Sequence, residues 1–210
     1  MYNFFIMVSE EVKIYFNENV KKCGWNNLYY GVFSSLIKEF NAQVTAEVGC
    51  GYGQHSKQIL QDTNVSKHYM IDQYKFYPND TFSDGIKNIK SNQTVDEKFN
   101  DFSEMVKNEV AQFKERVQFI HKSSIEASHD ISDNSLDAVF VDANHEFKYV
   151  LEDLYAWWPK VKSGGFMAGD DYCINDVKHA VNFFSNHKEL EVYFRIKENT
   201  DYKIYYFIKH

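Results

Sequence analysis

Two kinds of hydrophobic pattern alternate along the chain. Short, unbroken apolar runs predict buried strands, whereas apolar residues that recur every three to four positions predict amphipathic helices. Two further segments near the end alternate strictly between apolar and polar residues and predict a hairpin that turns at residues 199–201. The predicted strands cover residues 44–49, 68–72, 117–120, 136–142, 161–169, 191–195 and 203–209.

The helical pattern lies between these strands. Residues 73–98 are polar and have no clear period, so they are expected to be irregular. Strands that alternate with helices indicate βαβ units and therefore a mostly parallel sheet. The predicted helices cover residues 10–40, 54–61, 102–113, 147–158 and 177–186.

Together these elements predict one domain of the α/β class with a Rossmann-like, doubly wound fold. Its sheet has seven strands, is mostly parallel and ends in a C-terminal antiparallel hairpin, with helices on both faces. The single domain is expected to span residues 1–210, with an N-terminal helical cap at 1–40, a catalytic core at 44–210 and an insertion or lid at 73–115.

Composition and charge narrow the class of protein. The chain has 210 residues, 44% of them hydrophobic and 25% charged, which suits a globular domain with a real core. The net charge of −7 and the lack of a Lys/Arg-rich run make a nucleic-acid partner unexpected. No apolar run is long enough for a membrane span, and the first twelve residues lack the basic start of a signal peptide.

Cysteine usage bears on the compartment. Cys23, Cys50 and Cys173 are an odd number and have no C-x-x-C spacing. This pattern is typical of a reducing compartment and disfavours a zinc site. We therefore expect a cytoplasmic protein.

A glycine-rich loop follows the first predicted strand in the run Glu47-Val48-Gly49-Cys50-Gly51-Tyr52-Gly53. A dinucleotide-binding loop needs G-x-G-x-x-G, but its last position falls on Gln54 or Ser56 here. This departure disfavours a nicotinamide-dependent oxidoreductase. Glu47 just before the loop would repel a pyrophosphate but suits a cationic ligand, such as an ammonium or a sulfonium group. The other interpretation is a glycine-rich turn without a ligand.

Two polar positions follow the next strands. Asp72 ends the second strand about 20 residues after the loop, the spacing at which a carboxylate reaches ribose hydroxyls in such folds. The alternative is a solvated loop acid. Ser124 follows the third strand, where it is expected either to meet an adenine edge or simply to begin a helix.

Acidic residues follow the fourth and fifth strands. Because the carboxyl ends of parallel strands converge on the ligand crevice, we expect Asp142, Asp170 and Asp171 to lie together. Three carboxylates favour a Mg²⁺ site, while in the alternative Asp170 and Asp171 cap the following turn or helix and Asp142 contacts only a cofactor. His145 is expected to act as a general base, to support the residues of the site from behind, or to lie at the surface.

The glycine motif, Asp72, and the pairing of Asp142-x-x-His145 with Gly169-Asp170-Asp171-Tyr172 resemble the class I S-adenosylmethionine-dependent methyltransferases. The segment 136–172 is similar to the small-molecule O-methyltransferases that include the macrocin-type and cephalosporin-hydroxylase-like proteins. The resemblance covers about residues 44–172 and is weakest in 1–40 and 73–115, where the acceptor would bind.

The resemblance implies a site for S-adenosylmethionine and, in metal-using members, for Mg²⁺. It implies that Gly49, Gly51 and Gly53 pack against the donor with Glu47 nearby, that Asp72 holds the ribose, and that Asp142, Asp170 and Asp171 bind the metal. From their positions in the sequence, Cys50, Ser124 and Asp142 are further expected donor contacts, and His145 and Asp142 are the expected catalytic residues.

The predicted function is metal-assisted O-methylation of a small hydroxylated molecule. Two alternatives stay open: a non-catalytic scaffold on the same fold, and a protein or nucleic-acid methyltransferase, although no N-P-P-Y-type tetrapeptide is present. The acceptor and any homo-oligomer are left open, and no membrane partner is expected.

Overall fold

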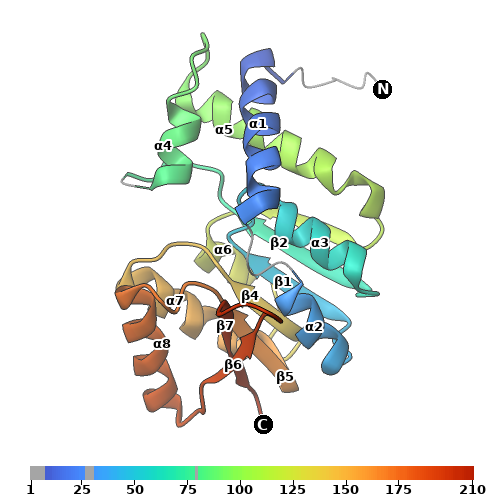
Figure 1. Cartoon of the computed structure of the whole chain (residues 1–210), viewed down its shortest axis with the longest axis vertical. Coiled ribbons are helices and arrows are strands. Elements are labelled where there is room, and N and C mark those ends of the chain that lie inside the picture. Colours follow the sequence, from blue (N-terminus) through green and yellow to red (C-terminus); the bar gives the residue numbers. More distant parts are fainter. Residues whose placement is uncertain (1–7, 27–30, 79) are drawn as a thin grey trace.

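The computed structural model describes residues 8–26, 31–78 and 80–210 (Figure 1). Residues 1–7 and 27–30 of the predicted cap and helical stretch lie outside the described residues. The helices are α1 (Glu10–Asn26), α2 (Val32–Glu39), α3 (Gln54–Asp62), α4 (Thr81–Lys87), α5 (Val95–Glu109), α6 (Ser124–His129), α7 (Phe147–Trp157) and α8 (Asn175–Lys188), with short 3₁₀ turns η1 (Ala111–Phe113) and η2 (Trp158–Lys160). The strands are β1 (Val44–Val48), β2 (Lys67–Asp72), β3 (Val117–His121), β4 (Leu136–Val141), β5 (Val161–Gly169), β6 (Tyr193–Ile196) and β7 (Lys203–Ile208).

The seven strands form one sheet in the order β3-β2-β1-β4-β5-β7-β6. Strands β1 to β5 run parallel, and β7 is antiparallel to both β5 and β6. This arrangement confirms the predicted fold class. The chain order reverses between β1 and β4, and in doubly wound sheets ligands bind outside the strand ends at such a switch point.

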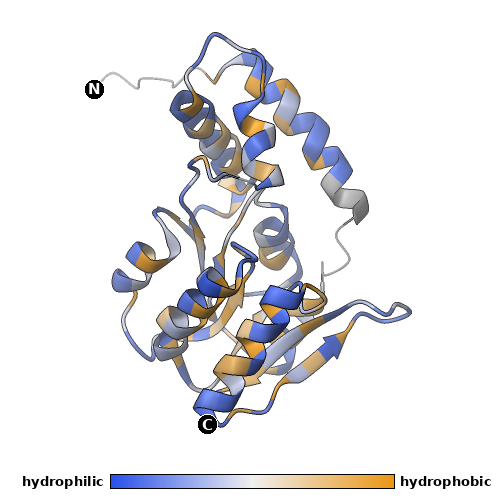
Figure 2. Cartoon of the chain, turned by 90° about the vertical axis from the view of Figure 1, so that its left-hand side faces the viewer, coloured by the Kyte–Doolittle hydropathy of each residue, from blue (hydrophilic) through white to orange (hydrophobic). Residues whose placement is uncertain are grey.

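Helices cover both faces of the sheet, because the strands are apolar on both sides. Phe140 of β4 packs in a cluster with α2, α3 and α5, whereas its neighbours Val139 and Val141 pack in a second cluster with α7 and α8. Side chains that alternate in this way follow from the two-residue period of a strand. In Figure 2 the covering helices carry hydrophobic and hydrophilic residues on different faces, as amphipathic helices do.

The expectation that 73–98 is irregular is wrong in part. Helix α4 lies within this segment, and α5 begins at Val95 rather than near 102. Local capping explains both starts: the Asp80 side chain accepts a hydrogen bond from the Ser83 N–H, and Thr94 and Glu97 form a capping box. These signals outweigh the weak hydrophobic period of the segment.

Helices α1, α4 and α5 lie together beyond one edge of the sheet (Figure 1). An aromatic cluster joins this layer to the glycine loop, since the Tyr52 ring packs within 5.2 Å of both Phe82 and Phe102. The Phe16 ring of α1 joins the same cluster, because it packs against the rings of Tyr52 and Phe102. The segments predicted as cap and insertion therefore pack on the loop that borders the candidate site. Among the described helices, none is both long and apolar enough to cross a lipid bilayer.

Candidate functional site

A cavity of about 570 Å³ lies at the carboxyl ends of β1, β2 and β4. This volume is within the range of small-molecule sites. Its walls come from the glycine loop, the segment after β2, the start of α6, the loop after β4 and one side of α7. The cavity therefore occupies the switch point of the sheet.

The glycine loop owes its shape to two positions in particular. Gly49 has φ +90°, and a Cβ there would lie 2.2 Å from the Asp142 carbonyl oxygen, so the loops after β1 and β4 approach each other closely only with glycine. Gly51 has φ +49° and open space where its Cβ would be, and it lines the cavity. Gly53 faces Val106 of α5 instead and is outside the cavity lining.

Asp72 lies in the cavity wall and is held by the backbone. Its Oδ2 accepts a hydrogen bond of 3.0 Å from the Gly51 N–H, and its Oδ1 accepts one of 2.9 Å from the Tyr74 N–H. Burial raises the pKa of Asp72 to about 6, against the lowering effect of these two bonds. The acid is thus fixed in orientation and still ionised at neutral pH.

Cys50 contributes to the cavity lining, but its thiol is buried. Its Sγ donates to the carbonyl oxygens of Glu47 and Ile71 at 3.6 and 3.4 Å. Burial raises the pKa of this thiol well above its usual range. The side chain therefore fastens the loop and offers no thiolate to a ligand.

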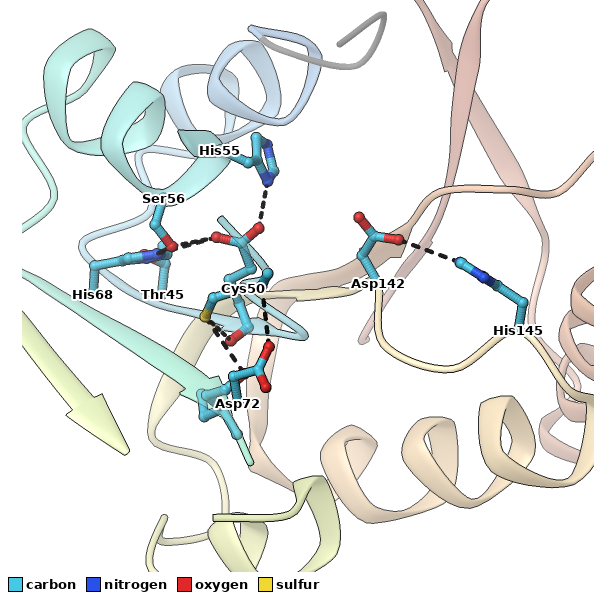
Figure 3. Close-up of polar contacts among 11 residues, drawn as sticks. Thr45, Cys50, His55, Ser56, His68, Asp72, Asp142 and His145 are labelled. Carbon is cyan, nitrogen blue, oxygen red and sulfur yellow. Dashed lines mark hydrogen bonds and ion pairs between the residues drawn. The ribbon is translucent and has the colours of Figure 1, made fainter. Parts of the chain in front are cut away.

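Glu47 lies beneath the loop and does not line the cavity. Its side chain is 1% exposed and is directed to the α3 side of the sheet, while those of Ala46 and Val48 are on the other side. His55 Nδ1 lies 2.9 Å from Glu47 Oε1, and the Ser56 hydroxyl donates to Glu47 Oε2 (Figure 3). The structure thus places Glu47 among buried polar side chains.

The hydrogen bonds around Glu47 fix the proton positions. Ser56 gives its one proton to Glu47, so it accepts from His68 Nε2 at 3.0 Å. His68 Nδ1 must then accept from the Thr45 hydroxyl at 2.8 Å. Burial lowers the pKa of His68 and keeps it neutral. Burial alone would raise the pKa of Glu47, but the charge and hydrogen bond of His55 bring it to about 2.

A second polar group lies after β4 and β5. His145 Nε2 lies 2.8 Å from Asp171 Oδ2 and 3.7 Å from Asp142 Oδ1. The possible ligand atoms of these three residues are all within 4.8 Å of one another. Hydrogen bonds to Asp142 and then Asp171 raise the pKa of His145 to about 10, so the imidazole is protonated between two carboxylates.

Asp170 is outside this group of three. Its side chain is 8% exposed, and its Oδ1 accepts a 2.6 Å hydrogen bond from the Asp171 N–H. Burial and then the charge of Asp142 raise the pKa of Asp170 to about 7, although a hydrogen bond from Tyr202 lowers it. Of the three predicted metal ligands, the structure therefore brings Asp142 and Asp171 together, with His145 rather than Asp170 as the third member of the group.

Ser124 begins α6 and lines the cavity wall. Its hydroxyl donates to Asp153 Oδ1 and accepts a 2.8 Å hydrogen bond from Trp157 Nε1. Sequence reasoning missed Asp153, as it missed His55, Ser56 and His68 as partners of Glu47. A signal existed for Asp153, since an acid lies on the otherwise apolar face of α7.

This sheet order, with a glycine loop and a strand-end acid at its switch point, defines a class I S-adenosylmethionine-dependent methyltransferase. A family model described as a methyltransferase domain matches residues 46–172. The match covers more than half of the chain, and the chain belongs to this family.

Solved structures share the fold at low sequence identity. A candidate caffeoyl-CoA O-methyltransferase from Staphylococcus aureus aligns with a TM-score of 0.62 at 15% identity, over 93% of this chain and 92% of that one. A methyltransferase from Geobacter sulfurreducens aligns at 0.61 and 10% identity, over 98% and 92%. An O-methyltransferase from Bacillus cereus, in complex with SAH, aligns at 0.60 and 10% identity, over 99% and 94%. No curated protein matches the sequence.

Proposed function

We propose that the protein transfers a methyl group from S-adenosylmethionine to a hydroxyl group of a small molecule, with help from a divalent cation. One observation carries the proposal: a single cavity is lined by the glycine loop and Asp72 and also by Asp142 and His145. A donor and an acceptor bound there would be neighbours. Holding both reactants in one geometry makes a large contribution to the rate of a bimolecular transfer.

The donor is assigned to the part of the cavity between the glycine loop and α6. The ionised Asp72 would accept hydrogen bonds from ribose hydroxyls, which are strong because the acceptor is charged. The open backbone at Gly51 leaves room for the methionine part. The Bacillus cereus relative was solved with SAH, which supports a donor of this chemistry.

The group of Asp142, His145 and Asp171 fits a divalent cation. Two carboxylates and one imidazole, with ligand atoms within 4.8 Å, make a mixed oxygen and nitrogen donor set. Carboxylates suit Mg²⁺, and an imidazole also suits Mn²⁺ or another first-row metal. When bound, such a cation would lower the pKa of an acceptor hydroxyl and hold its oxygen near the methyl group.

The chain's own residues would position the acceptor and take up its proton. Asp142 lies in the cavity wall, and its main-chain N–H donates to the Val48 carbonyl at 2.9 Å, which fixes it to the end of β1. Water would accept the hydroxyl proton, because His145 is protonated between Asp142 and Asp171 without a cation and would be a ligand once a cation binds. The three helices α1, α4 and α5 would exclude water from the site, because α4 and α5 contact Tyr52 of the glycine loop.

The free cysteines indicate the cellular compartment in which the proposed activity takes place. Cys50 and Cys173 are both unpaired thiols, and Cys173 is exposed. Exposed free thiols persist in a reducing environment. We therefore assign the activity to the cytoplasm.

Calorimetry with S-adenosylmethionine, in the presence and absence of Mg²⁺ or Mn²⁺, tests the donor site first. Radiolabelled methyl transfer to a panel of hydroxylated small molecules then tests the reaction. Donor binding with metal-stimulated turnover is the expected result. Donor binding without turnover on any acceptor would favour the non-catalytic alternative, and failure to bind the donor would remove the proposal.

The variant Asp72→Asn is expected to weaken binding of S-adenosylhomocysteine by about 10–100-fold, because a charged acceptor is lost and the new amide faces the N–H of Gly51 or Tyr74. Since the pKa of Asp72 is about 6, the affinity of the wild type should also fall as the pH drops through about 6, and that of the variant should not. Calorimetric titrations from pH 5 to 8 measure both effects. Asp133→Asn, an exposed acid before β4, is the control; equal affinities for Asp72→Asn and wild type would contradict the assignment.

A further inference from the structure

Helix α7 presents a buried acid to the donor cavity. Asp153 is 5% exposed and lies among the buried residues Val150, Leu154 and Trp157 of its own helix. It also lines the cavity. An acid on such a face is unfavourable unless its oxygens find partners, and burial accordingly raises the pKa of Asp153 to about 7. Its position calls for a ligand or a structural partner.

The hydrogen bonds of Ser124 show that Asp153 acts as an acceptor. Trp157 Nε1 is only a donor, so Ser124 Oγ accepts from it and gives its own proton to Asp153 Oδ1. The chain Trp157–Ser124–Asp153 therefore orients the carboxyl group. Within residues 8–26, 31–78 and 80–210, no second hydrogen bond to Asp153 is present besides the one from Ser124. The acid keeps acceptor capacity at the cavity wall.

The position of Asp153 relative to Asp72 indicates which part of the donor it would meet. Asp72 ends β2, and Ser124 follows β3, which is the neighbouring strand. A ribose held at Asp72 would direct its base along the cavity towards Ser124 and Asp153. Adenine presents an exocyclic amine as a donor on its edge, beside ring nitrogens that accept. A carboxylate acceptor fixed by Ser124 complements that amine.

We infer that Asp153 accepts a hydrogen bond from the exocyclic amine of the donor's adenine and so makes this cavity select adenosyl over inosyl ligands. The inference rests on the proposed function, because it requires the donor to bind in this cavity. It assigns base recognition to a helix that follows β4, whereas the sequence had suggested only Ser124 for the adenine edge. Asp153 is a specificity-determining residue here and takes no part in the chemical step.

The test compares the dissociation constants of S-adenosylhomocysteine and S-inosylhomocysteine, measured by calorimetry. We expect the wild type to prefer the adenosyl ligand by about tenfold or more, because the inosyl oxygen would face a carboxylate. Asp153→Asn can donate an amide N–H to that oxygen, so its preference should shift towards the inosyl ligand. Asp130→Asn removes an exposed acid that directly follows α6 and pairs with Lys122, and it should keep the wild-type ratio.

The possible outcomes distinguish a failure of adenine recognition by Asp153 from a failure of donor binding in the cavity. If the wild type binds the two ligands equally, or if Asp153→Asn keeps the wild-type ratio, Asp153 has only a structural role and the inference is overturned. If the wild type binds neither ligand, the proposed donor site itself fails. The wild-type ratio needs no variant, so the inference stays testable even if Asp153→Asn does not fold.

Discussion

Glu47→Ala is expected to lower the free energy of unfolding by about 2–5 kcal/mol, since each buried donor left without an acceptor costs about 1–3 kcal/mol. The substitution would leave the Ser56 hydroxyl and the His55 Nδ1 donor without their acceptor in a site that is almost closed to water. It would also release the hydrogen-bonded chain through His68 to Thr45. Urea unfolding followed by circular dichroism measures the difference.

The pH dependence of unfolding gives a second, independent sign of this role. The pKa of Glu47 is about 2 in the folded protein and ordinarily 4.5, so its stabilisation is complete above about 4.5 and is lost as the pH falls towards 2. Asp72, Asp153 and Asp170 behave in the opposite way, because their pKa values are raised to about 6, 7 and 7. Their contribution is complete below about 4 and is lost as the pH rises through 6 to 7.

The wild type should therefore be most stable at about pH 4, where Glu47 is almost fully ionised and the three raised acids are still protonated in the folded protein, with a decline on both sides. Glu47→Ala should keep the decline above this value and lose much of the decline below it. Glu39→Ala, which removes a half-exposed acid paired with Arg195, is the control and should change stability by less than about 1 kcal/mol. If Glu47→Ala left stability intact and weakened only donor binding, Glu47 would serve the ligand directly, as its place before the glycine loop had suggested.

The fold was predictable because its strands are apolar on both faces and are separated by helices of clear period. Phe140 and its neighbours Val139 and Val141 show why: an unbroken apolar run suits a strand covered on both sides. Helix α4 was not predictable in this way, since its seven residues carry little hydrophobic period and depend on the Asp80 cap. Short helices of this kind are specified by capping and packing more than by pattern.

The candidate site was predictable where function follows the strand ends. Asp72 ends β2, Asp142 directly follows β4, and both line the cavity. The environment of Glu47 was not predictable, because it depends on which face of β1 the side chain occupies and on partners 8 to 21 residues away in other elements. Asp153 was missed for a related reason: the hydrogen bond that orients it joins α6 to α7 across 29 residues.

Asp142→Asn is expected to reduce methyl transfer by about 10²–10³-fold, which corresponds to the several kcal/mol that a catalytic cation supplies. The change is nearly isosteric, and the contacts of the Asp142 backbone with Val48 and the Gly49 region should survive. Affinity for S-adenosylhomocysteine should therefore change by less than about threefold, within the range of a lost partial contact. Single-turnover transfer from labelled donor to the acceptor found in the panel measures the rate of methyl transfer. Calorimetric titration with Mn²⁺ measures the affinity for the cation.

The comparison with Asp170→Asn decides which acids form the metal site. Asp170 is outside the group of Asp142, His145 and Asp171, and its Oδ1 accepts from the Asp171 N–H. Its substitution should therefore leave Mn²⁺ affinity within about threefold of the wild type, while Asp142→Asn and Asp171→Asn should each weaken it by about tenfold or more. His145→Gln should weaken it as well, since an imidazole ligand is lost. A larger loss in Asp170→Asn than in His145→Gln would restore the set of three carboxylates that the sequence predicts. That result would mean that Asp170 turns outwards when the cation binds, because in this structure its carboxylate is directed to the Asp171 N–H.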